Sequence, residues 1–439
     1  MTDAGLPSDG TLFDGTLLTD PHAGYAHLRT ACPVVRTTTP DGAPVWLVTR
    51  YEDVRAGLAD PRLSLSKATS TSSGTHGASM PSALDAHLLN MDPPDHTRVR
   101  RLVAPAFTAR SVARLRPAIE RRTAELLDRF QGGSADVMGD FATPLALTVI
   151  CDVLGIAEED RRDFRTWTDA LRSPAPDAAL ASRRALKDMH RYLVGLIAGK
   201  RERPGDDLLT QMVSAHEDGD RLSEPELVAL AFLLLFAGYD NSANLVGNAV
   251  LALLTHEEAL TALRSGGLAV GRVVDEVMRW NSPSMLASRR FAREDLDIGG
   301  VRIAAGERIW MSLTSANRDP QQFDDPGRFD PGRFDPGRFD PGRFDPGRFD
   351  PGRFDPARHD AGRFDPARHD AGRPEGGHLG FGHGIHHCLG SALARLEAGI
   401  AVEALVRRFP SLRAADPDAA VTWCESFRNR GPLALPVTW

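Results

Sequence analysis

One cysteine lies in a setting that favours a reactive or metal-binding thiolate. The segment HLGFGHGIHHCLG spans residues 378–390, and after Cys388 the apolar residues recur every three or four positions, which predicts a helix. A helix N-terminus stabilises a thiolate through its dipole and its unbonded N–H groups. Gly382, Gly384 and Gly390 surround the cysteine and let a flat group approach the backbone closely. A thiolate facing a planar group is the arrangement that a haem iron with a cysteine ligand requires.

The same segment also offers nitrogen ligands, which leaves a zinc site as an alternative. Cys388 stands close to four histidines, which are His378, His383, His386 and His387. A structural zinc site draws its four ligands from two pairs of residues at matched spacings. The rest of the chain holds no second pair of this kind. We therefore favour haem over zinc.

The spacing of the glycines around the cysteine resembles a known loop. The pattern F-x-x-G-x-x-x-C-x-G begins at Phe381 and ends at Gly390, with His386 two residues before the cysteine. It is similar to the haem-binding loop of the cytochrome P-450 family of haem-thiolate monooxygenases. The resemblance implies that Cys388 is the axial ligand of the iron of haem b. It further implies haem contacts from Phe381, Gly382, His386 and Gly390.

Two earlier segments resemble the parts of that family that bind the haem propionates. In MDPPDHTRVRRLV (91–103), His96 and Arg100 are four residues apart and share one face of a predicted helix. Two basic groups on one face suit two anionic groups. The segment SRRFAREDLDIGG (288–300) supplies Arg290. The resemblance implies that these three residues and His386 bind the propionates. The alternative for the first segment is a solvated, basic start of a helix.

A carboxylate and a guanidinium share a helix face in VVDEVMRW (273–280). Glu276 and Arg279 are three residues apart. The pair resembles the Glu-x-x-Arg pair of the same family, which braces the fold beside the haem loop. The spacing alone carries no information, because Glu158 and Arg161 have it too. Its position before a predicted hairpin and the Cys388 segment is what supports the assignment.

The central apolar helix departs from the family pattern. The family usually has Ala-Gly-x-Asp/Glu-Thr, and its threonine helps to deliver protons to iron-bound oxygen. This chain has AGYDNSANL, in which Ala237, Gly238, Asp240 and Asn241 match those positions. The small residues would leave room for dioxygen. An amide can donate and accept hydrogen bonds but cannot pass on a proton as a hydroxyl does. We therefore assign Asp240 and Asn241 to proton and water handling, with Asn241 as a mere partner of a helix carbonyl as the alternative.

The resemblance implies insertion of one oxygen atom from dioxygen into a small or mid-sized, mainly apolar organic molecule, in a biosynthetic or catabolic tailoring step. Electrons would come from NAD(P)H through a ferredoxin reductase and a ferredoxin. By the same matching, the substrate-facing residues are Leu233, Phe236, Ala237 and Leu286. Two alternatives stay open. One is oxidation without oxygen insertion, such as coupling or desaturation, and the other is a non-catalytic haem-binding protein.

The composition of the chain limits which of these predictions are plausible for the whole protein. The chain has 439 residues and a net charge of −7, which gives no sign of a nucleic-acid partner. Its start has no basic region followed by an apolar one, so we expect no signal peptide. The most apolar run, residues 227–238, is far shorter than the roughly 20 residues of a membrane span, so we expect a buried core helix. Four scattered cysteines indicate a reducing compartment. We expect a cytoplasmic monomer without membrane attachment.

The elements that must position these residues are mainly helices. Apolar periodicity predicts helices over residues 111–130, 184–200, 224–256, 268–281 and 389–409. Strand patterns are short and lie at 44–50, 296–311 and 431–439, the second as a hairpin that turns at Gly299-Gly300. We predict a mainly α protein with a minor sheet, the cytochrome P-450 fold. The haem would lie between the central helix and the Cys388 loop.

A repeat separates the hairpin from the Cys388 segment. Five FDPGR units occupy residues 329–353, and two copies of FDPARHDAGR follow to residue 373. Each Asp-Pro-Gly-Arg favours a turn, and each unit is neutral with one phenylalanine to bury. Such a segment cannot offset its ordering entropy, so we expect an exposed, disordered loop, with a docking role as the alternative. The chain is then one domain, 1–439, interrupted at 329–373.

Overall fold

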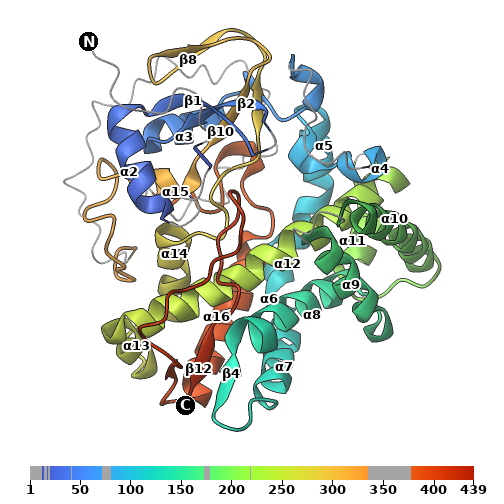
Figure 1. The fold of residues 1–439 in the computed structure, drawn as a ribbon. Coiled ribbons are helices and arrows are strands. Elements are labelled where there is room, and N and C mark those ends of the chain that lie inside the picture. The colour runs from blue at the N-terminus through green and yellow to red at the C-terminus, as the bar shows by residue number, and fades with distance from the viewer. Residues whose placement is uncertain are drawn as a thin grey trace.

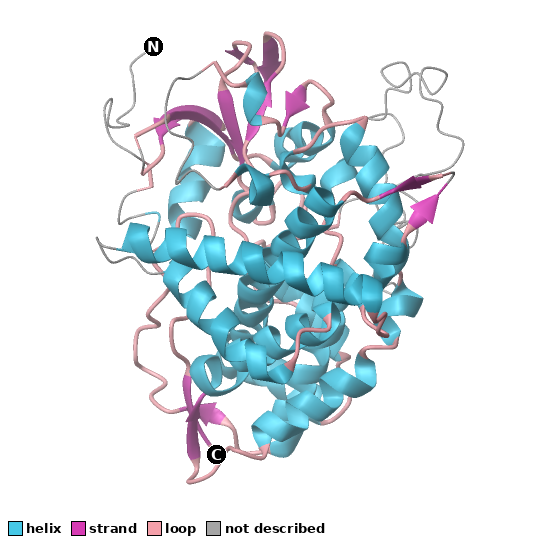
Figure 2. Ribbon diagram, turned by 90° about the vertical axis from the view of Figure 1, so that its right-hand side faces the viewer, coloured by secondary structure: helices cyan, strands magenta, loops and turns pink. Residues whose placement is uncertain are grey.

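The computed structural model describes residues 12–13, 17, 20–40, 42–71, 81–172, 178–217, 219–334 and 377–439. Within them the protein is mainly helical with small sheets, as the sequence predicts (Figure 2). The helices are α2 (Pro21–Ala31), α3 (Tyr51–Ala59), α4 (Ser82–Asp85), α5 (Asp95–Val103), α6 (Ala109–Ala113), α7 (Arg116–Leu127), α8 (Thr143–Leu154), α9 (Arg161–Arg172), α10 (Ala178–Glu202), α11 (Leu208–Ser214), α12 (Glu224–Thr255), α13 (Glu257–Arg264), α14 (Val270–Trp280), α15 (Leu313–Ala316) and α16 (Ser391–Arg408). The strands are β1 (Val34–Thr38), β2 (Pro44–Val48), β3 (Leu63–Ser64), β4 (Ser134–Asp136), β5 (His216–Glu217), β6 (Asp220–Arg221), β7 (Arg290–Ala292), β8 (Leu296–Ile298), β9 (Val301–Ile303), β10 (Arg308–Met311), β11 (Arg413–Ala414) and β12 (Pro436–Thr438).

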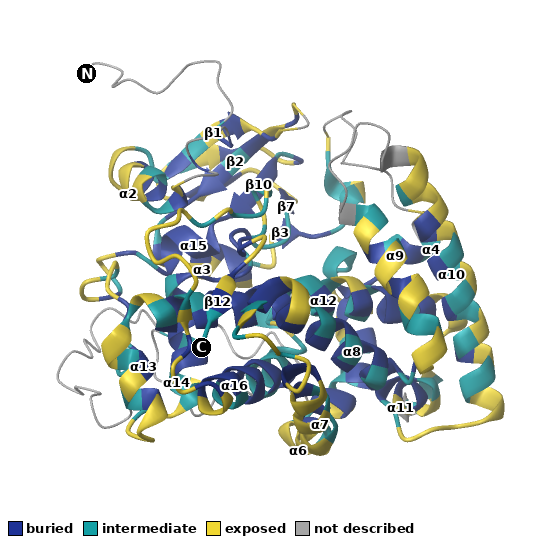
Figure 3. Ribbon diagram, turned by 60° about the horizontal axis from the view of Figure 1, so that its bottom comes forward, coloured by how far each residue is buried: buried dark blue, intermediate teal, exposed yellow. Residues whose placement is uncertain are grey.

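α12 runs through the middle of the molecule, as Figure 1 shows, and confirms the helix predicted at 224–256. Its start is fixed by a capping box, in which Ser223 and Glu226 exchange side-chain and backbone hydrogen bonds. Pro225 in the first turn needs no N–H donor there. The helix packs against α8, α10, α14 and α16, whereas the outer helices α10 and α13 keep exposed faces (Figure 3).

α12 and the stretch Val137–Leu154 are long and apolar enough to span a membrane by length and composition. Of their most apolar windows, 56% and 67% are buried inside the protein. We therefore interpret both as core helices, which is the interpretation that the sequence favours for residues 227–238.

A five-stranded sheet lies at the N-terminal side of the fold, with the strand order β1-β2-β10-β7-β3. β2 and β10 run parallel, and the other neighbours are antiparallel. The predicted hairpin is present as β8 and β9, and its turn uses Gly299 and Gly300 at φ values of 54° and 83°. Positive φ at both positions is what the tight hairpin turn needs, and glycine adopts it without strain.

Helix 111–130 is not continuous as predicted. The structure divides this region into α6 and α7, with a break at Arg114 and Leu115. Pro117 is the physical reason, because it occupies the first turn of α7, where its missing N–H is not required. The apolar periodicity continued through a break that the proline marks.

The structure describes the first six residues of the predicted insertion, 329–334, and these are not an exposed loop. Phe329 is only 5% exposed, and its ring lies 5.5 Å from that of Trp280. The amide of Asp330 donates to Glu276 Oε1 at 2.8 Å. The turn itself is as predicted, since Arg333 N donates to the Asp330 carbonyl at 2.9 Å. Residues 335–373 lie outside the described residues.

Candidate cofactor site

The Cys388 segment is a tight loop that ends at the start of α16. The amide of Cys388 donates to the Phe381 carbonyl at 2.8 Å, which closes the loop upon itself. Gly382 and Gly384 have φ values of 76° and 71°, so both adopt the left-handed conformation that glycine tolerates. A Cβ atom at Gly384 would also lie 2.9 Å from the Leu58 carbonyl oxygen. The glycines thus serve the close turn that the sequence predicts.

The surroundings of the Cys388 thiol shift its pKa in both directions. Its side chain keeps accessible surface, yet burial is the largest influence on it and raises the pKa of the thiol. A thiol that opens onto a space inside the protein accounts for both observations. The backbone N–H of Gly390 and the charges of Arg100 and Arg395 act the other way and lower that pKa. These three groups would stabilise a thiolate that a metal ion holds deprotonated.

Four basic side chains predicted to bind propionates converge near this loop. The rings of His96 and His386 lie 4.1 Å apart between centroids. Burial lowers the pKa of His96 to about 4 and that of His386 to about 2, and neighbouring cations add to both shifts. Arg290 and Arg100 are among the cations that act on His386. Burial also lowers the pKa of Arg290 to about 10, although Asp92 opposes this.

These side chains fit a group that carries carboxylates. Arg290 donates to the carbonyls of Leu58 and Ser288, and Arg100 donates to the carbonyl of His387 at 2.7 Å. Both ring nitrogens of His96 and Nδ1 of His386 are buried without a hydrogen-bond partner. Within the described ranges, none of these four residues is hydrogen-bonded to a carboxylate. Arg100 and Arg290 are cations that require anionic partners, and the uncharged histidines have ring nitrogens that require hydrogen-bond partners; haem propionates would supply both.

One face of α12 stays accessible in the core of the protein. Leu233, Ala237 and Asn241 recur at intervals of four, so they share that face, and all three are half-buried. Phe236 beside them is 50% exposed, which is unusual for a large apolar side chain in a central helix. Three predicted substrate-facing residues thus lie together.

Two other predictions for this region need revision. Leu286 is buried, at 4% exposure, in a core cluster with Met285 and Trp310, so we withdraw it from the substrate-facing set. A Cβ atom at Gly238 would lie 3.1 Å from Ile150 of α8. This glycine therefore permits the close packing of α8 on α12, so its small size serves packing at this position.

Asn241 is fixed by two hydrogen bonds. Its Nδ2 donates to the carbonyl of Ala237 at 3.1 Å, which is the helix-carbonyl contact considered as the alternative above. Its Oδ1 accepts from the hydroxyl of Ser284 at 3.2 Å. Asp240, the neighbouring acid, is half-buried. The amide is therefore oriented, but it has no hydroxyl with which to relay a proton.

Glu276 and Arg279 form a fully buried, two-pronged ion pair, with N···O distances of 2.6 and 2.8 Å. Arg279 also donates to the carbonyls of Asn317, Pro326 and Arg328. The pair thus fastens the chain that leads toward the Cys388 loop. By contrast, Glu158, which has the same spacing to Arg161, has a side chain that is 76% exposed.

Sequence reasoning missed three residues near the site. Arg395 lies one turn into α16, with its guanidinium 4.2 Å from the Phe381 ring and its Nε 2.8 Å from Asp275. Glu397 is buried on the same helix, and burial raises its pKa to about 8. A hydrogen bond with Ser242 acts in the opposite direction and lowers this pKa. Ser284 is the partner of Asn241. An acid at an apolar helix position was a signal for Glu397, whereas nothing local marked Ser284.

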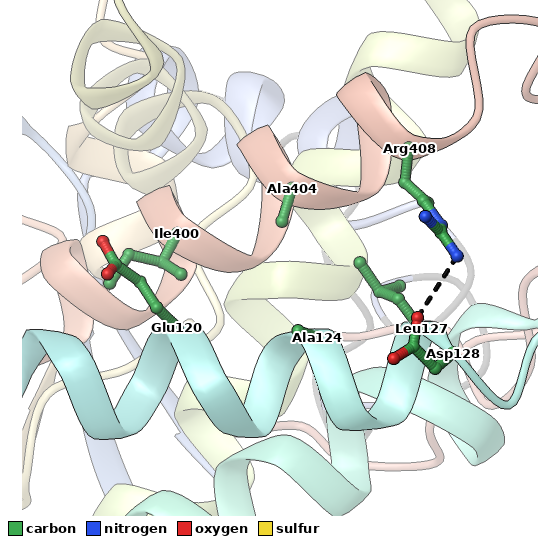
Figure 4. Close-up of a pocket in the computed structure, with 7 residues that line it drawn as sticks. All are labelled: Glu120, Ala124, Leu127, Asp128, Ile400, Ala404 and Arg408. Carbon is green, nitrogen blue, oxygen red and sulfur yellow. Dashed lines mark hydrogen bonds and ion pairs between the residues drawn. The ribbon is translucent and has the colours of Figure 1, made fainter.

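A surface pocket of about 220 Å³ lies between α7 and α16 (Figure 4). It is lined by Glu120, Ala124, Leu127, Asp128, Ile400, Ala404 and Arg408. At a rise of about 1.5 Å per residue, these α16 residues lie roughly 18–30 Å along the chain from Cys388. The pocket is therefore separate from the candidate cofactor site.

Comparisons with known proteins agree with this arrangement. Residues 270–343 and 335–416 match the model of the family described as cytochrome P-450. The chain is 42% identical to cytochrome P-450 107B1 of Saccharopolyspora erythraea, over 100% of this chain and 99% of that protein. It is 39% identical to the cytochrome P-450 monooxygenase PikC of Streptomyces venezuelae, over 96% of this chain and 91% of that protein. The solved structure of the ligand-free monooxygenase TamI has a TM-score of 0.81 at 38% identity, covering 98% of this chain and 94% of that one.

Proposed function

The chain belongs to the cytochrome P-450 family and is a haem-thiolate monooxygenase, and we propose that Cys388 supplies the thiolate ligand of its haem b. His96, Arg100, Arg290 and His386 bind the propionates in this proposal. The observation that carries it is the convergence of these four basic side chains near the Cys388 loop, with His96 and Arg290 buried and Arg100 and His386 half-buried. When bound, the haem would supply the iron centre at which dioxygen is activated for insertion of one oxygen atom into the substrate.

The protein's own residues have two further tasks. Phe381, Gly382 and Gly390 shape the loop, and the Gly390 N–H with the charges of Arg100 and Arg395 stabilises the thiolate. On α12, Asn241 offers hydrogen-bonding groups that orient water, and the neighbouring Asp240 is the ionisable group that handles protons. Proton delivery by a positioned group is typically worth about 10²–10⁴-fold in rate.

The substrate is a small or mid-sized, mainly apolar organic molecule. Leu233, Phe236 and Ala237 support this, because they offer an apolar, accessible face on α12. The relatives support it too. One is named a vitamin D(3) 25-hydroxylase, from Pseudonocardia autotrophica, at 38% identity, and another a mycinamicin IV hydroxylase/epoxidase, from Micromonospora griseorubida, at 36%. We assign the reaction to a biosynthetic or catabolic tailoring step.

Oxidation without oxygen insertion is the second candidate. Asn241 cannot act as a hydroxyl relay, and a structural neighbour at 32% identity and a TM-score of 0.79 is described as an enzyme for C–S bond formation.

Electrons come from NAD(P)H through a ferredoxin reductase and a ferredoxin in this proposal. Arg110 of α6, Arg116 of α7 and Arg114 in the break between these helices are exposed, and both helices pack against α16. Exposed basic residues would attract an acidic donor, so reduction should slow as salt rises. Arg114 and Arg116 have acidic neighbours too, Asp206 and Glu120, but their side chains are 61% and 54% exposed. Arg98 is less accessible, because its side chain is 32% exposed and pairs with both Asp220 and Glu226. The enzyme works in the cytoplasm as a monomer, without a membrane or nucleic-acid partner.

The test begins with the reduced carbon monoxide complex, whose red-shifted Soret band reports thiolate ligation. A library of macrolides, steroids and fatty acids is then screened by the spin-state shift of the haem. Ligands that shift it are incubated with NADPH, a surrogate ferredoxin system and ¹⁸O₂. One ¹⁸O atom in the product supports monooxygenation. A product without label supports the second candidate.

A further inference from the structure

One of the two hydrogen bonds of Asn241, that from the Ser284 hydroxyl, joins the middle of α12 to a segment that lies 43 residues further along the chain. We infer that Ser284 is a positioning residue for oxygen activation, because its hydroxyl holds the Asn241 carboxamide with an N–H, and not the carbonyl, available to the oxygen-binding side. This inference rests on the proposed function. It assigns a task to a residue outside the haem loop and outside the central helix.

The orientation of the amide follows from its partners. The Ala237 carbonyl can only accept, so Nδ2 and not Oδ1 must face it, at 3.1 Å. Oδ1 then faces the Ser284 hydroxyl, which donates to it at 3.2 Å. One N–H of Nδ2 is left over after these contacts. Asn241 shares the accessible face of α12 with Leu233 and Ala237, which is the face that we propose to meet substrate and oxygen.

Ser284 is itself held in place by its backbone. It pairs with Asn429 in an isolated antiparallel bridge. The amide of Arg430 donates to the Pro283 carbonyl and the amide of Met285 donates to the Arg428 carbonyl, both at 2.8 Å. The serine therefore sits on a short extended segment that is fastened on both sides of it. Its hydroxyl is a fixed anchor for the amide.

This anchoring has a chemical consequence. A threonine hydroxyl at 241 could rotate and both donate and accept, whereas a carboxamide clamped at both ends offers one fixed donor. Without Ser284, the amide is held only by the Ala237 contact and can turn. Loss of one hydrogen bond of ordinary net strength raises the population of other orientations by about fivefold. Asn241 acts as an oriented donor only while Ser284 is present.

The probe for this orientation is carbon monoxide bound to the reduced holoenzyme. Its C–O stretching frequency, read by infrared spectroscopy, responds to a hydrogen-bond donor beside the bound ligand. Ser284→Ala should move this frequency in the same direction as Asn241→Ala and by at least half as much. Ser284→Thr keeps a hydroxyl on the same atom and should leave the frequency unchanged.

Two controls separate positioning from a general loss of structure. Ser282→Ala removes a buried hydroxyl from the same segment, one without a hydrogen-bond partner, and should leave the frequency unchanged. In an Asn241→Thr background, Ser284→Ala should have no effect on the frequency, because the threonine hydroxyl does not use this anchor. The melting temperature of each variant checks that the fold is intact.

The outcomes are distinguishable from failure of the proposed function. If the wild type lacks the thiolate-type Soret band, the haem-ligand proposal fails. If that band is normal in every variant but Ser284→Ala leaves the C–O frequency at the wild-type value, the role of Ser284 is overturned. The role is equally overturned if Ser284→Ala shifts the frequency as much in the Asn241→Thr background as in the wild type.

Discussion

Replacing Glu276 by glutamine should destabilise the protein severely, although it only exchanges one carboxylate oxygen for an NH2 group. The Glu276 carboxylate and the Arg279 guanidinium are both fully buried. Glu276 Oε1 also accepts from the Asp330 amide at 2.8 Å, and Arg333 Nε lies 3.6 Å from it. A glutamine amide would turn an N–H toward one of these donors. It would also leave the Arg279 charge buried without an anionic partner.

The size of the effect can be worked out. Breaking a buried ion pair by removing one partner costs about 3–5 kcal/mol. Unfolding entropy near the melting temperature is about 2.1 cal/mol/K per residue, so 439 residues give roughly 0.9 kcal/mol/K. The melting temperature should therefore fall by about 3–5 °C. Haem content per protein should fall with it, since Arg279 fastens Asn317, whose Oδ1 accepts from the Leu379 amide at 2.6 Å just before the Cys388 loop.

The matched control is Glu158→Gln, because Glu158 has the same Glu-x-x-Arg spacing. Its side chain is 76% exposed, and its nearest cation is Arg122 at 3.7 Å. An exposed pair of this kind is worth about 0–1 kcal/mol, so the melting temperature should change by about 1 °C at most. Thermal unfolding is followed by circular dichroism, and haem content by the ratio of Soret to protein absorbance. Equal melting temperatures for the two variants would refute the argument that burial, and not sequence spacing, makes the pair structural.

Three further predictions follow from the same structure. Cys388→His should remove the thiolate-type Soret band of the reduced carbon monoxide complex, whereas Cys424→Ser should keep it; an unchanged band in the first variant would exclude Cys388 as the ligand. Glu397 keeps its proton up to about pH 8 when folded but loses it near pH 4.5 when unfolded, so its contribution to stability falls as pH rises from about 5 to 8. Glu397→Gln should therefore flatten the fall of the melting temperature over that range, and an unchanged slope would count against a buried neutral acid. Deletion of residues 339–373 should leave haem content and melting temperature unchanged, and a clear drop in either would mean that the later units pack.

Local sequence patterns predicted those features that depend on neighbours along the chain. The helix at 224–256 was readable from the spacing of its apolar residues, and the turn at Gly299-Gly300 was readable because a turn conformation depends on a few adjacent residues. The glycines around Cys388 were readable for the same reason. The proline at 117 was readable too, but the apolar periodicity around it outweighed its signal.

Features that depend on distant partners were not readable. Ser284 looks like any loop serine, and only the folding of residues 428–430 against it makes its hydroxyl an anchor. Leu286 was expected to face a substrate, but Trp310 and Met285 cover it. The resemblance placed His96 and Arg290 in one site, but their burial without a carboxylate partner is a property of the folded protein. The sequence shows which polar residues could form a site. The tertiary packing decides which of them are buried without a hydrogen-bond partner or a counter-ion.

The repeat shows how an expanded segment can leave a fold intact. Its first unit is part of the core, since Phe329 packs on Trp280 and the backbone amide of Asp330 donates to Glu276. The two family-model matches overlap at residues 335–343, within the repeat, as expected if one family element has been copied. Each later FDPGR copy carries the same residues in the same order. A deletion of whole five-residue units therefore brings an equivalent phenylalanine and aspartate to the Glu276 network. A fourfold longer loop costs only about 1.2 kcal/mol in closure entropy, so the number of copies should have little effect on the free energy of unfolding. The contacts of the first copy are what the fold requires.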